Sequence, residues 1–317
     1  MRGNHHVFER LIAQSKNREA VSVAVAFPCD EVSLAGAVEA ARCGLIIPFL
    51  VGPRAQILAV AGASGLDVSP YRIVEAEDAE AAVTRAVALC RTAECAALMK
   101  GSLHTDLLMH EVMKPNLGLR GQRRASHVFV MDVPDYPKML LITDAAINIY
   151  PTLEDKVDIV QNAIDLARVL GIAQPKVAIL SAVETVTPKI NSTIDAAALC
   201  KMAERGQIVG GILDGPLAFD NAVSLKAAAI KHIVSPVAGQ ADILVVPDLE
   251  SGNMLAKQLE YLAEAEAAGV VVGARVPIVL TSRSDSAKAR LASCAVIAML
   301  AHAHRAAKPG SLVTAGN

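Results

Sequence analysis

The stretch 21-VSVAVAFPCDEVSLAGAVEAARCGLIIPFLVGP-53 contains two apolar runs separated by a segment of helical character. The runs 21–27 and 47–53 are almost continuously apolar, which is typical of strands buried on both faces of a parallel sheet. Residues 30–43, between them, form a helical pattern long enough to connect two parallel strands. The stretch therefore predicts a right-handed strand–helix–strand unit.

The same alternation continues through most of the chain. Further strands are expected at 71–75, 96–101, 127–133, 137–147, 176–182, 210–215 and 241–249, with two more in 269–282. Helices are expected after most of them, including 105–114, about 153–170 and a last one that ends near residue 307. The strands around residues 133 and 137 are too close for a crossover helix, so they should form an antiparallel hairpin. More than ten strands favour two lobes over one sheet.

The composition agrees with an α/β protein and excludes several other classes. The 317 residues are 53% hydrophobic but only 3% aromatic, and the net charge of −2 gives no basic footprint for nucleic acid or a membrane surface. The opening MRGNHHVFERLIAQ is mixed and charged, unlike a signal peptide, and we find no transmembrane segment. The six cysteines form no CxxC pair, which predicts free thiols and a cytoplasmic location.

Ligands of open α/β sheets gather at the carboxyl ends of strands. Five predicted strand ends carry polar or glycine-rich residues, namely 99-MKGSLHTD-106, 143-TDAAINIYP-151, 213-LDGPLAFDN-221, 247-PDLESGN-253 and 281-TSRSDS-286. No Walker A motif and no GxGxxG motif occurs anywhere in the chain. These five stretches are therefore the candidate functional segments.

The first of these stretches can be an anion site or a helix cap. Lys100 and Gly101 end a strand, and His104 or Thr105 begins the next helix. Free backbone N–H groups and the helix dipole favour an anion at such a point. The alternative is that Thr105 simply caps the helix.

The stretch 281-TSRSDS-286 has two similar interpretations. Arg283 can bind a phosphate or carboxylate through two parallel hydrogen bonds, Ser282 and Ser284 add donors, and Asp285 can accept a proton. In the alternative, Ser284 caps a helix whose first turn contains Asp285 and Ser286, and Arg283 is solvated.

Two other stretches also have purely structural alternatives. In 247-PDLESGN-253, Ser251 can be a helix cap followed by a tight turn at Gly252-Asn253. Asp214-Gly215-Pro216 can be a turn and nothing more.

Taken together, the five stretches resemble the phosphate acetyltransferase/phosphate butyryltransferase family. The chain contains its KG-x-x-HT, D-x-A-x-N, DGPL-x-x-D and PDL-x-x-GN segments and its late Ser-Arg pair, in the family's order over about residues 20–305. The segment 183-VETVTPKINSTIDAA-197 resembles the butyryltransferase-like branch.

The resemblance implies a fold and an assembly. Such enzymes have two α/β domains flanking a cleft, similar to isocitrate and isopropylmalate dehydrogenases, and they form homodimers. For this chain it implies a discontinuous domain I at 1–140 and 283–317, and a domain II at 141–282.

The resemblance also implies the reaction acyl-CoA + phosphate = acyl phosphate + CoA, by direct thiol attack in a ternary complex. Neither a metal, a covalent acyl-enzyme nor a cofactor is expected, since CoA is a substrate. The expected partners are CoA, acyl-CoA, inorganic phosphate and acyl phosphate. The sequence does not rank acetyl, propionyl and butyryl groups, because one methylene changes binding by only about 1–3 kcal/mol.

Site residues follow from the same resemblance. Arg283 is expected to hold the phosphoryl oxygens, Ser282 to donate to the carbonyl oxygen, and Asp285 to act as the base. The phosphate pocket is expected to include Ser102, His104, Thr105, Asn148 and Arg283. The CoA site is expected to include Arg120, Arg123, Arg124, Asp214, Gly215 and Asn253. A solvated basic loop is the alternative for the three arginines in LRGQRR.

The sequence departs from the acetyl-specific pattern at two positions. Ala289 stands where those members carry an acid, and the candidates to replace that acid as the base are Asp285, or Asp214 or Asp220 from elsewhere. Ala145 stands where they carry a cysteine, which argues against a covalent cysteine mechanism.

Two other functions compete with this one. A metal-dependent dehydrogenase of the same fold, including the hydroxythreonine-phosphate type, would need converging metal ligands and a nucleotide loop, which we cannot assign. A non-catalytic acyl-CoA-sensing module, of the kind fused to malic enzymes, would not need the Ser282-Arg283 pair that this chain keeps.

Overall fold

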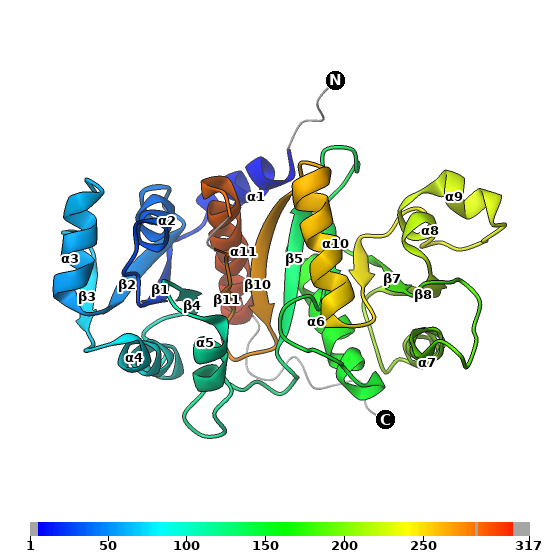
Figure 1. The fold of residues 1–317 in the computed structure, drawn as a ribbon, viewed down its shortest axis with the longest axis horizontal. Coiled ribbons are helices and arrows are strands. Elements are labelled where there is room, and N and C mark those ends of the chain that lie inside the picture. The colour runs from blue at the N-terminus through cyan, green and yellow to red at the C-terminus, as the bar shows by residue number, and fades with distance from the viewer. Residues whose placement is uncertain (1–5, 283–284, 307–317) are drawn as a thin grey trace. The chain divides into compact units, whose positions relative to one another are not determined.

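The structure is a computed structural model that describes residues 6–282 and 285–306. Their contacts divide the chain into two compact units (Figure 1). We call Phe8–Gly121 together with the segment from Ala274 onward the split unit, and Gln122–Gly273, which His6 and Val7 join, the continuous unit. The strands belong to one eleven-stranded sheet, to which the split unit contributes five strands and the continuous unit six. The predicted α/β class is therefore confirmed, whereas the expectation that more than ten strands would not form a single sheet is wrong.

The split unit contributes the parallel part of the sheet, with the strand order β3-β2-β1-β4-β11. Its strands are β1 (Val21–Ala26), β2 (Ile46–Gly52), β3 (Arg72–Glu75), β4 (Ala97–Lys100) and β11 (Ile278–Val279). The first stretch quoted above forms β1, a helix and β2, so the predicted strand–helix–strand unit is confirmed. The strand order changes direction at β1, because β2 and β3 are added on one side of β1 and β4 on the other. Open α/β sheets bind ligands at such a switch point.

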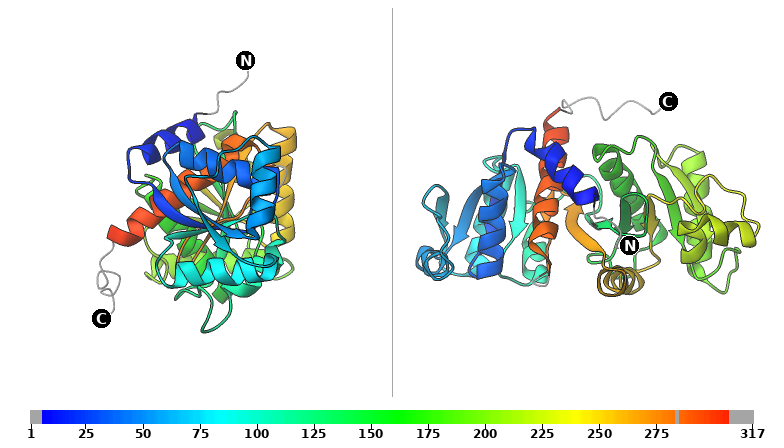
Figure 2. Two further views of the ribbon diagram at one scale, coloured as in Figure 1. Left: turned by 90° about the vertical axis from the view of Figure 1, so that its left-hand side faces the viewer. Right: turned by 90° about the horizontal axis from the view of Figure 1, so that it is seen from above.

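Helices cover this sheet from segments that are far apart in the sequence. They are α1 (Val7–Lys16), α2 (Glu31–Arg42), α3 (Arg54–Ala63), α4 (Ala79–Arg91), α5 (Thr105–Val112) and α11 (Ala287–Ala306). The last helix, α11, packs on α2, as the right-hand view of Figure 2 shows. Helix α4 packs on α5.

The continuous unit contributes the mixed part of the sheet, with the strand order β10-β5-β6-β9-β7-β8. Its strands are β5 (Ser126–Asp132), β6 (Leu140–Thr143), β7 (Lys176–Leu180), β8 (Ile212–Leu217), β9 (Ile243–Val245) and β10 (Glu266–Val272). The pairs β10–β5 and β5–β6 are antiparallel and the other pairs are parallel. The predicted hairpin is therefore confirmed, with Val128 opposite Thr143.

The helices of the continuous unit begin mostly at strand ends. They are α6 (Leu153–Val169), α7 (Asn191–Glu204), α8 (Phe219–Val223), α9 (Leu225–Ile230) and α10 (Leu249–Leu262). Thr152 and Asp155 form a capping box at the start of α6, which fixes where this helix begins. No helix of the described residues is long and apolar enough to cross a membrane.

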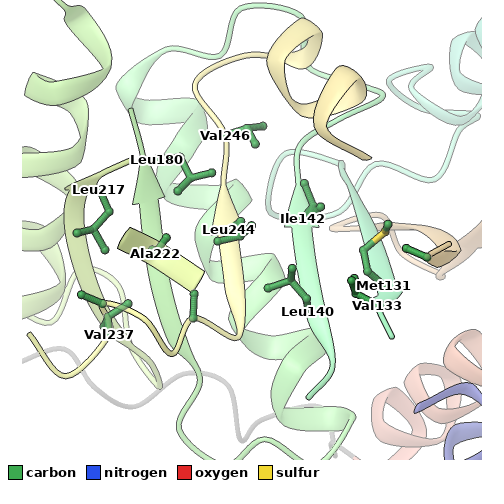
Figure 3. Packing of buried hydrophobic residues seen from close by; sticks show 14 of the residues in the cluster. Met131, Val133, Leu140, Ile142, Leu180, Leu217, Ala222, Val237, Leu244 and Val246 are labelled. Atoms are coloured by element: carbon green, nitrogen blue, oxygen red, sulfur yellow. The ribbon is translucent and has the colours of Figure 1, made fainter. Parts of the chain in front are cut away.

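Small and branched aliphatic side chains fill the core of the continuous unit. Figure 3 shows them on neighbouring strands, with Ile142, Leu244 and Leu180 contributed by β6, β9 and β7. Ala222 and Val237 close the cluster from the segment that follows β8. Because aliphatic residues from parallel strands supply this core, the low aromatic content does not prevent burial.

Two of the structural alternatives for the polar stretches are wrong. Asp248, not Ser251, caps α10, because its carboxylate accepts the amide of Ser251 at 2.8 Å. Gly252 and Asn253 therefore lie inside the helix and not in a turn. Asp214-Gly215-Pro216 is part of β8, so it is not a turn either.

Candidate active site

The loop after β4 is pressed against the end of β1. The amide of Gly101 donates to Ala26 O at 2.9 Å, and that of Ser102 donates to Phe27 O at 2.8 Å. A Cβ at position 101 would lie 2.4 Å from Ala26 O, so only glycine fits there. The Lys-Gly pair thus places Ser102 at the switch point of the split-unit sheet.

Lys100 and the start of α5 complete this loop. Lys100 is only 9% exposed, and its Nζ donates to Leu103 O at 3.2 Å. Helix α5 begins at Thr105, with exposed His104 in the N-cap position and no side-chain cap bond, so the interpretation of Thr105 as a cap is wrong. Ser102 and Thr105 are half-buried and lie close to this N-terminus, and their phosphate roles stay predictions.

The loop after β11 begins next to the loop after β4, because Val279 pairs with Met99. Ser282 is exposed, and its amide donates to Asp285 Oδ2 at 2.7 Å. Arg283 and Ser284 lie outside the described residues, and so does the alternative cap at Ser284. The Oγ of Ser286 accepts a hydrogen bond from the backbone N–H of Ala289 at 3.0 Å, so Ser286 caps α11.

The two departures from the acetyl-specific pattern are both buried. Ala289 lies on α11 at 3% exposure, and it provides no carboxylate near Ser282. Ala145 is fully buried, and a Cβ on Gly252 would lie 3.1 Å from its Cβ. A bulkier side chain at position 145 would therefore press on α10.

In the continuous unit, Asp144 organises the loop after β6. Its carboxylate is 3% exposed and accepts the amides of Ala146 and Ile147, both at 3.0 Å. It also accepts Nδ2 of Asn148 at 2.6 Å. Burial raises the pKa of Asp144, and the hydrogen bonds from these amides oppose that rise.

Asn148 and Arg124 belong to the same network. Asn148 donates to Ala125 O at 3.0 Å and accepts Arg124 Nε at 2.5 Å. Arg124 also pairs with Asp155 at the start of α6, at 3.0 Å. The structure thus brings together one residue predicted for the phosphate pocket and one predicted for the CoA site, although it buries Asn148.

The other two arginines of the basic run have different neighbours. Arg123 pairs with Asp165 of α6, with 2.6 Å between Nη1 and Oδ2. Arg120 belongs to the split unit and is exposed, and its Nε donates to Met113 O at 2.5 Å. Arg123 and Arg124 therefore combine partial exposure with ion pairs, whereas a purely solvated loop would have no such partners.

The remaining predicted CoA residues lie within β8 and on α10. The half-buried Asp214 accepts the amide of Gly215 at 2.8 Å. Asn253, on α10, donates to Ala145 O at 3.2 Å. A Cβ on Gly252 would lie 2.6 Å from Val246 after β9 and 3.1 Å from Asp144 O after β6, so the glycine lets α10 approach both strand ends. Asp220, an alternative base, pairs with Lys231 at 3.2 Å.

Sequence reasoning missed two residues that organise these loops. Asp144 was read only as part of a motif, although its spacing of four from Asn148 is a signal of a local side-chain contact. Arg290 was not singled out, yet it donates to Ser282 O at 3.1 Å from within α11. The available signal is an arginine next to the long small and apolar run of α11.

The described residues also bear on metal and thiol chemistry. In them, no group of three or more His, Cys, Asp or Glu side chains is arranged to hold a metal ion. All six cysteines are free, as the sequence predicted. Burial and the neighbouring Asp30 raise the pKa of Cys29 to about 11, so this thiol is protonated at neutral pH and is a poor nucleophile.

His127 on β5 gives a prediction about stability. The side chain is 1% exposed, and its Nδ1 has no hydrogen-bond partner among the described residues. Burial, and then Lys257, lower its pKa to about 3, whereas the pKa in an unfolded chain is about 6.5. Because the folded pKa is lowered, the stabilisation is present above the unfolded pKa and is lost as the pH falls.

We therefore expect the free energy of unfolding to drop more steeply between about pH 6.5 and pH 5 in the wild type than in His127→Phe, by up to about 1.4 kcal/mol per pH unit. Urea unfolding at several pH values measures this slope. His110→Gln, at an exposed position on α5, is the control and should keep the wild-type slope. Equal slopes in His127→Phe and the wild type would show that His127 is charged in the folded protein.

Comparisons with known proteins agree with the motifs at these strand ends. The family described as "Phosphate acetyl/butaryl transferase" matches residues 76–299. The phosphate acetyltransferase of Rhizobium meliloti is 63% identical over 301 residues, which cover 95% of each chain. The phosphate butyryltransferase of Clostridium acetobutylicum is 40% identical, over 93% of this chain and 98% of that protein.

A solved structure of a related protein has the same fold. The crystal structure of a branched-chain phosphotransacylase from Enterococcus faecalis superposes with a TM-score of 0.78 and 32% identity. The match covers 89% of this chain and 99% of that one. The likeness therefore extends over most of the fold.

Proposed function

Because the chain belongs to the phosphate acetyl/butaryl transferase family, we propose that it catalyses acyl-CoA + phosphate = acyl phosphate + CoA. The chain is an acyltransferase, and the 63% identity to a phosphate acetyltransferase over 95% of both chains carries this conclusion. Relatives that match over nearly the whole chain are named as transferases, so neither a sensing module nor a dehydrogenase is retained.

The proposed mechanism is direct attack in a ternary complex. The CoA thiol attacks the acyl carbonyl, the S–C bond forms, and the C–O bond to phosphate breaks, so that inorganic phosphate leaves. Asp285 takes the thiol proton, because a thiol with a pKa near about 8.5 is mostly protonated at neutral pH. Its Oδ2 already accepts the amide of Ser282, which supports a fixed place for the base beside the serine.

Ser282 and Arg283 have separate roles in this proposal. Ser282 donates its hydroxyl to the carbonyl oxygen as negative charge develops there. Arg283 holds the phosphoryl oxygens through two parallel bonds. Ser102, His104 and Thr105 add donors at the start of α5, a location favoured by the adjacency of β4 and β11 in the sheet.

Further parts of the proposal concern CoA and the assembly. We place the CoA phosphates at Arg120, Arg123 and Arg124, and the rest of CoA near Asp214, Gly215 and Asn253. Asn148 is kept as a phosphate-site residue whose amide is held by Asp144. The proposal also includes two α/β domains flanking a cleft with a discontinuous first domain, a homodimer, a cytoplasmic location, and no metal or cofactor besides CoA as substrate.

An acyl-transfer assay tests the function directly. On mixing the protein with CoA and acetyl, propionyl or butyryl phosphate, we expect thioester absorbance to rise with at least one of the three. Protein treated with a chelator should react at the same rate, because no step uses a metal. A protein-free reaction is the control. Absence of thioester with all three acyl phosphates would contradict the proposed function.

A further inference from the structure

Arg290 is a buried cation that touches the backbone of Ser282. It lies on α11, directly after the loop that follows β11, and is 8% exposed. Its Nη2 donates to the carbonyl oxygen of Ser282 at 3.1 Å, across eight residues. Burying a charged guanidinium costs free energy. Packing alone therefore does not explain why Arg290 is buried next to the carbonyl of Ser282.

A glycine on the neighbouring helix makes room for this side chain. Gly36 lies within α2, and a Cβ there would come within 3.0 Å of Arg290 Cδ. Glycine weakens a helix interior relative to alanine, so its presence needs an explanation. The passage of the arginine stem between α2 and α11 supplies one.

Side chains hold both polar groups of the Ser282 backbone. Asp285 accepts its N–H at 2.7 Å, and Arg290 donates to its C=O at 3.1 Å. We propose that Arg290 is a positioning residue for acyl transfer, which fixes the Ser282 peptide so that the serine side chain is held at the reaction centre. This inference rests on the proposed function of Ser282.

The size of the effect follows from the geometry that catalysis requires. A displacement of about 1 Å at a reacting group can lower a rate by about 10²-fold. Arg290→Met keeps the long apolar stem but removes the donor, so it tests the bond to Ser282 and not the packing. Arg290→Lys keeps a charged donor and should restore part of the activity.

The experiment measures turnover and backbone protection in the same variants. For Arg290→Met we expect kcat to fall by about 10- to 100-fold with KM for CoA changed by less than about threefold. Hydrogen exchange of the peptide that spans Thr281–Ser286, measured by mass spectrometry, should become several-fold faster. Arg290→Lys should give intermediate values of both.

Two other variants separate this role from simple packing. Ser293→Ala removes a buried hydroxyl that bonds within α11, and it should leave kcat and the exchange near wild type. If Arg290→Met does not fold, Gly36→Ala displaces the arginine stem from outside and should lower kcat and speed the exchange in the same direction.

Unchanged exchange in Arg290→Met would overturn the proposal, and so would faster exchange with normal kcat. The exchange measurement does not depend on turnover. A wild-type protein without acyl transfer would therefore contradict the proposed function, and with it a role for Arg290 in acyl transfer. The exchange would still decide whether Arg290 fixes the Ser282 peptide.

Discussion

Asp285→Asn is expected to lower kcat for acyl transfer by about 10²- to 10⁴-fold, the usual contribution of a general base. The asparagine oxygen can still accept the amide of Ser282, so the loop after β11 keeps its hydrogen bond while the proton acceptor is lost. Initial rates with saturating CoA and acyl phosphate measure the loss. The effect should weaken at high pH, where the free thiolate of CoA becomes abundant.

Three companion variants identify the base. Asp285→Ala removes both the base and the contact with Ser282, so it should be at least as slow as Asp285→Asn. Asp220→Asn is the matched control on an exposed carboxylate paired with Lys231, and it should remain near wild type. If Asp285→Asn is nearly as active as the wild type, Asp285 only supports the loop, and Asp214→Asn becomes the next variant to measure.

Ser282→Ala is expected to lower kcat by about 10²- to 10³-fold, equivalent to about 2.7–4 kcal/mol of transition-state stabilisation. The loss follows from removing a donor to the developing oxyanion, so KM for CoA should change little. Steady-state kinetics with the preferred acyl phosphate measure both parameters. If kcat is unchanged and kcat/KM falls only because KM rises, Ser282 contributes to substrate binding alone.

A second serine in the same loop is the control for Ser282. Ser286→Ala removes the cap of α11 and should cost about 0.5–2 kcal/mol of stability with little effect on kcat. Loss of kcat without loss of stability in Ser282→Ala, and loss of stability without loss of kcat in Ser286→Ala, would separate catalysis from capping.

Arg283→Ala should also lose most of its turnover without unfolding, and near-normal activity would show that Arg283 is a surface charge.

The course of the chain could be predicted well because it depends on local patterns. Continuous apolar runs and helical spacing located β1, α2 and β2, and the short gap near residue 133 predicted the β5–β6 hairpin. These features depend on burial and on the minimum length of a crossover, both of which are visible in a single sequence.

The partners of polar side chains could not be predicted in the same way. Asp248 and Ser251 are both good cap residues, and only the backbone geometry decides that Asp248 caps α10. The network around Asp144 includes Arg124, which lies on a different segment, and its members meet only once the sheet has formed. The contact of Arg290 with Ser282 likewise depends on where α11 begins.

The route of the chain through the split unit has a consequence for its synthesis. Leu98 pairs with Ile278, a separation of 180 residues, whereas all strands of the continuous unit lie within Gln122–Gly273. Domains fold as units, generally in the order in which the ribosome releases them, and distant pairings form late. The edge of β4 therefore stays open until the continuous unit has been made, and a nascent chain acquires Ser282 only in the final stage of translation.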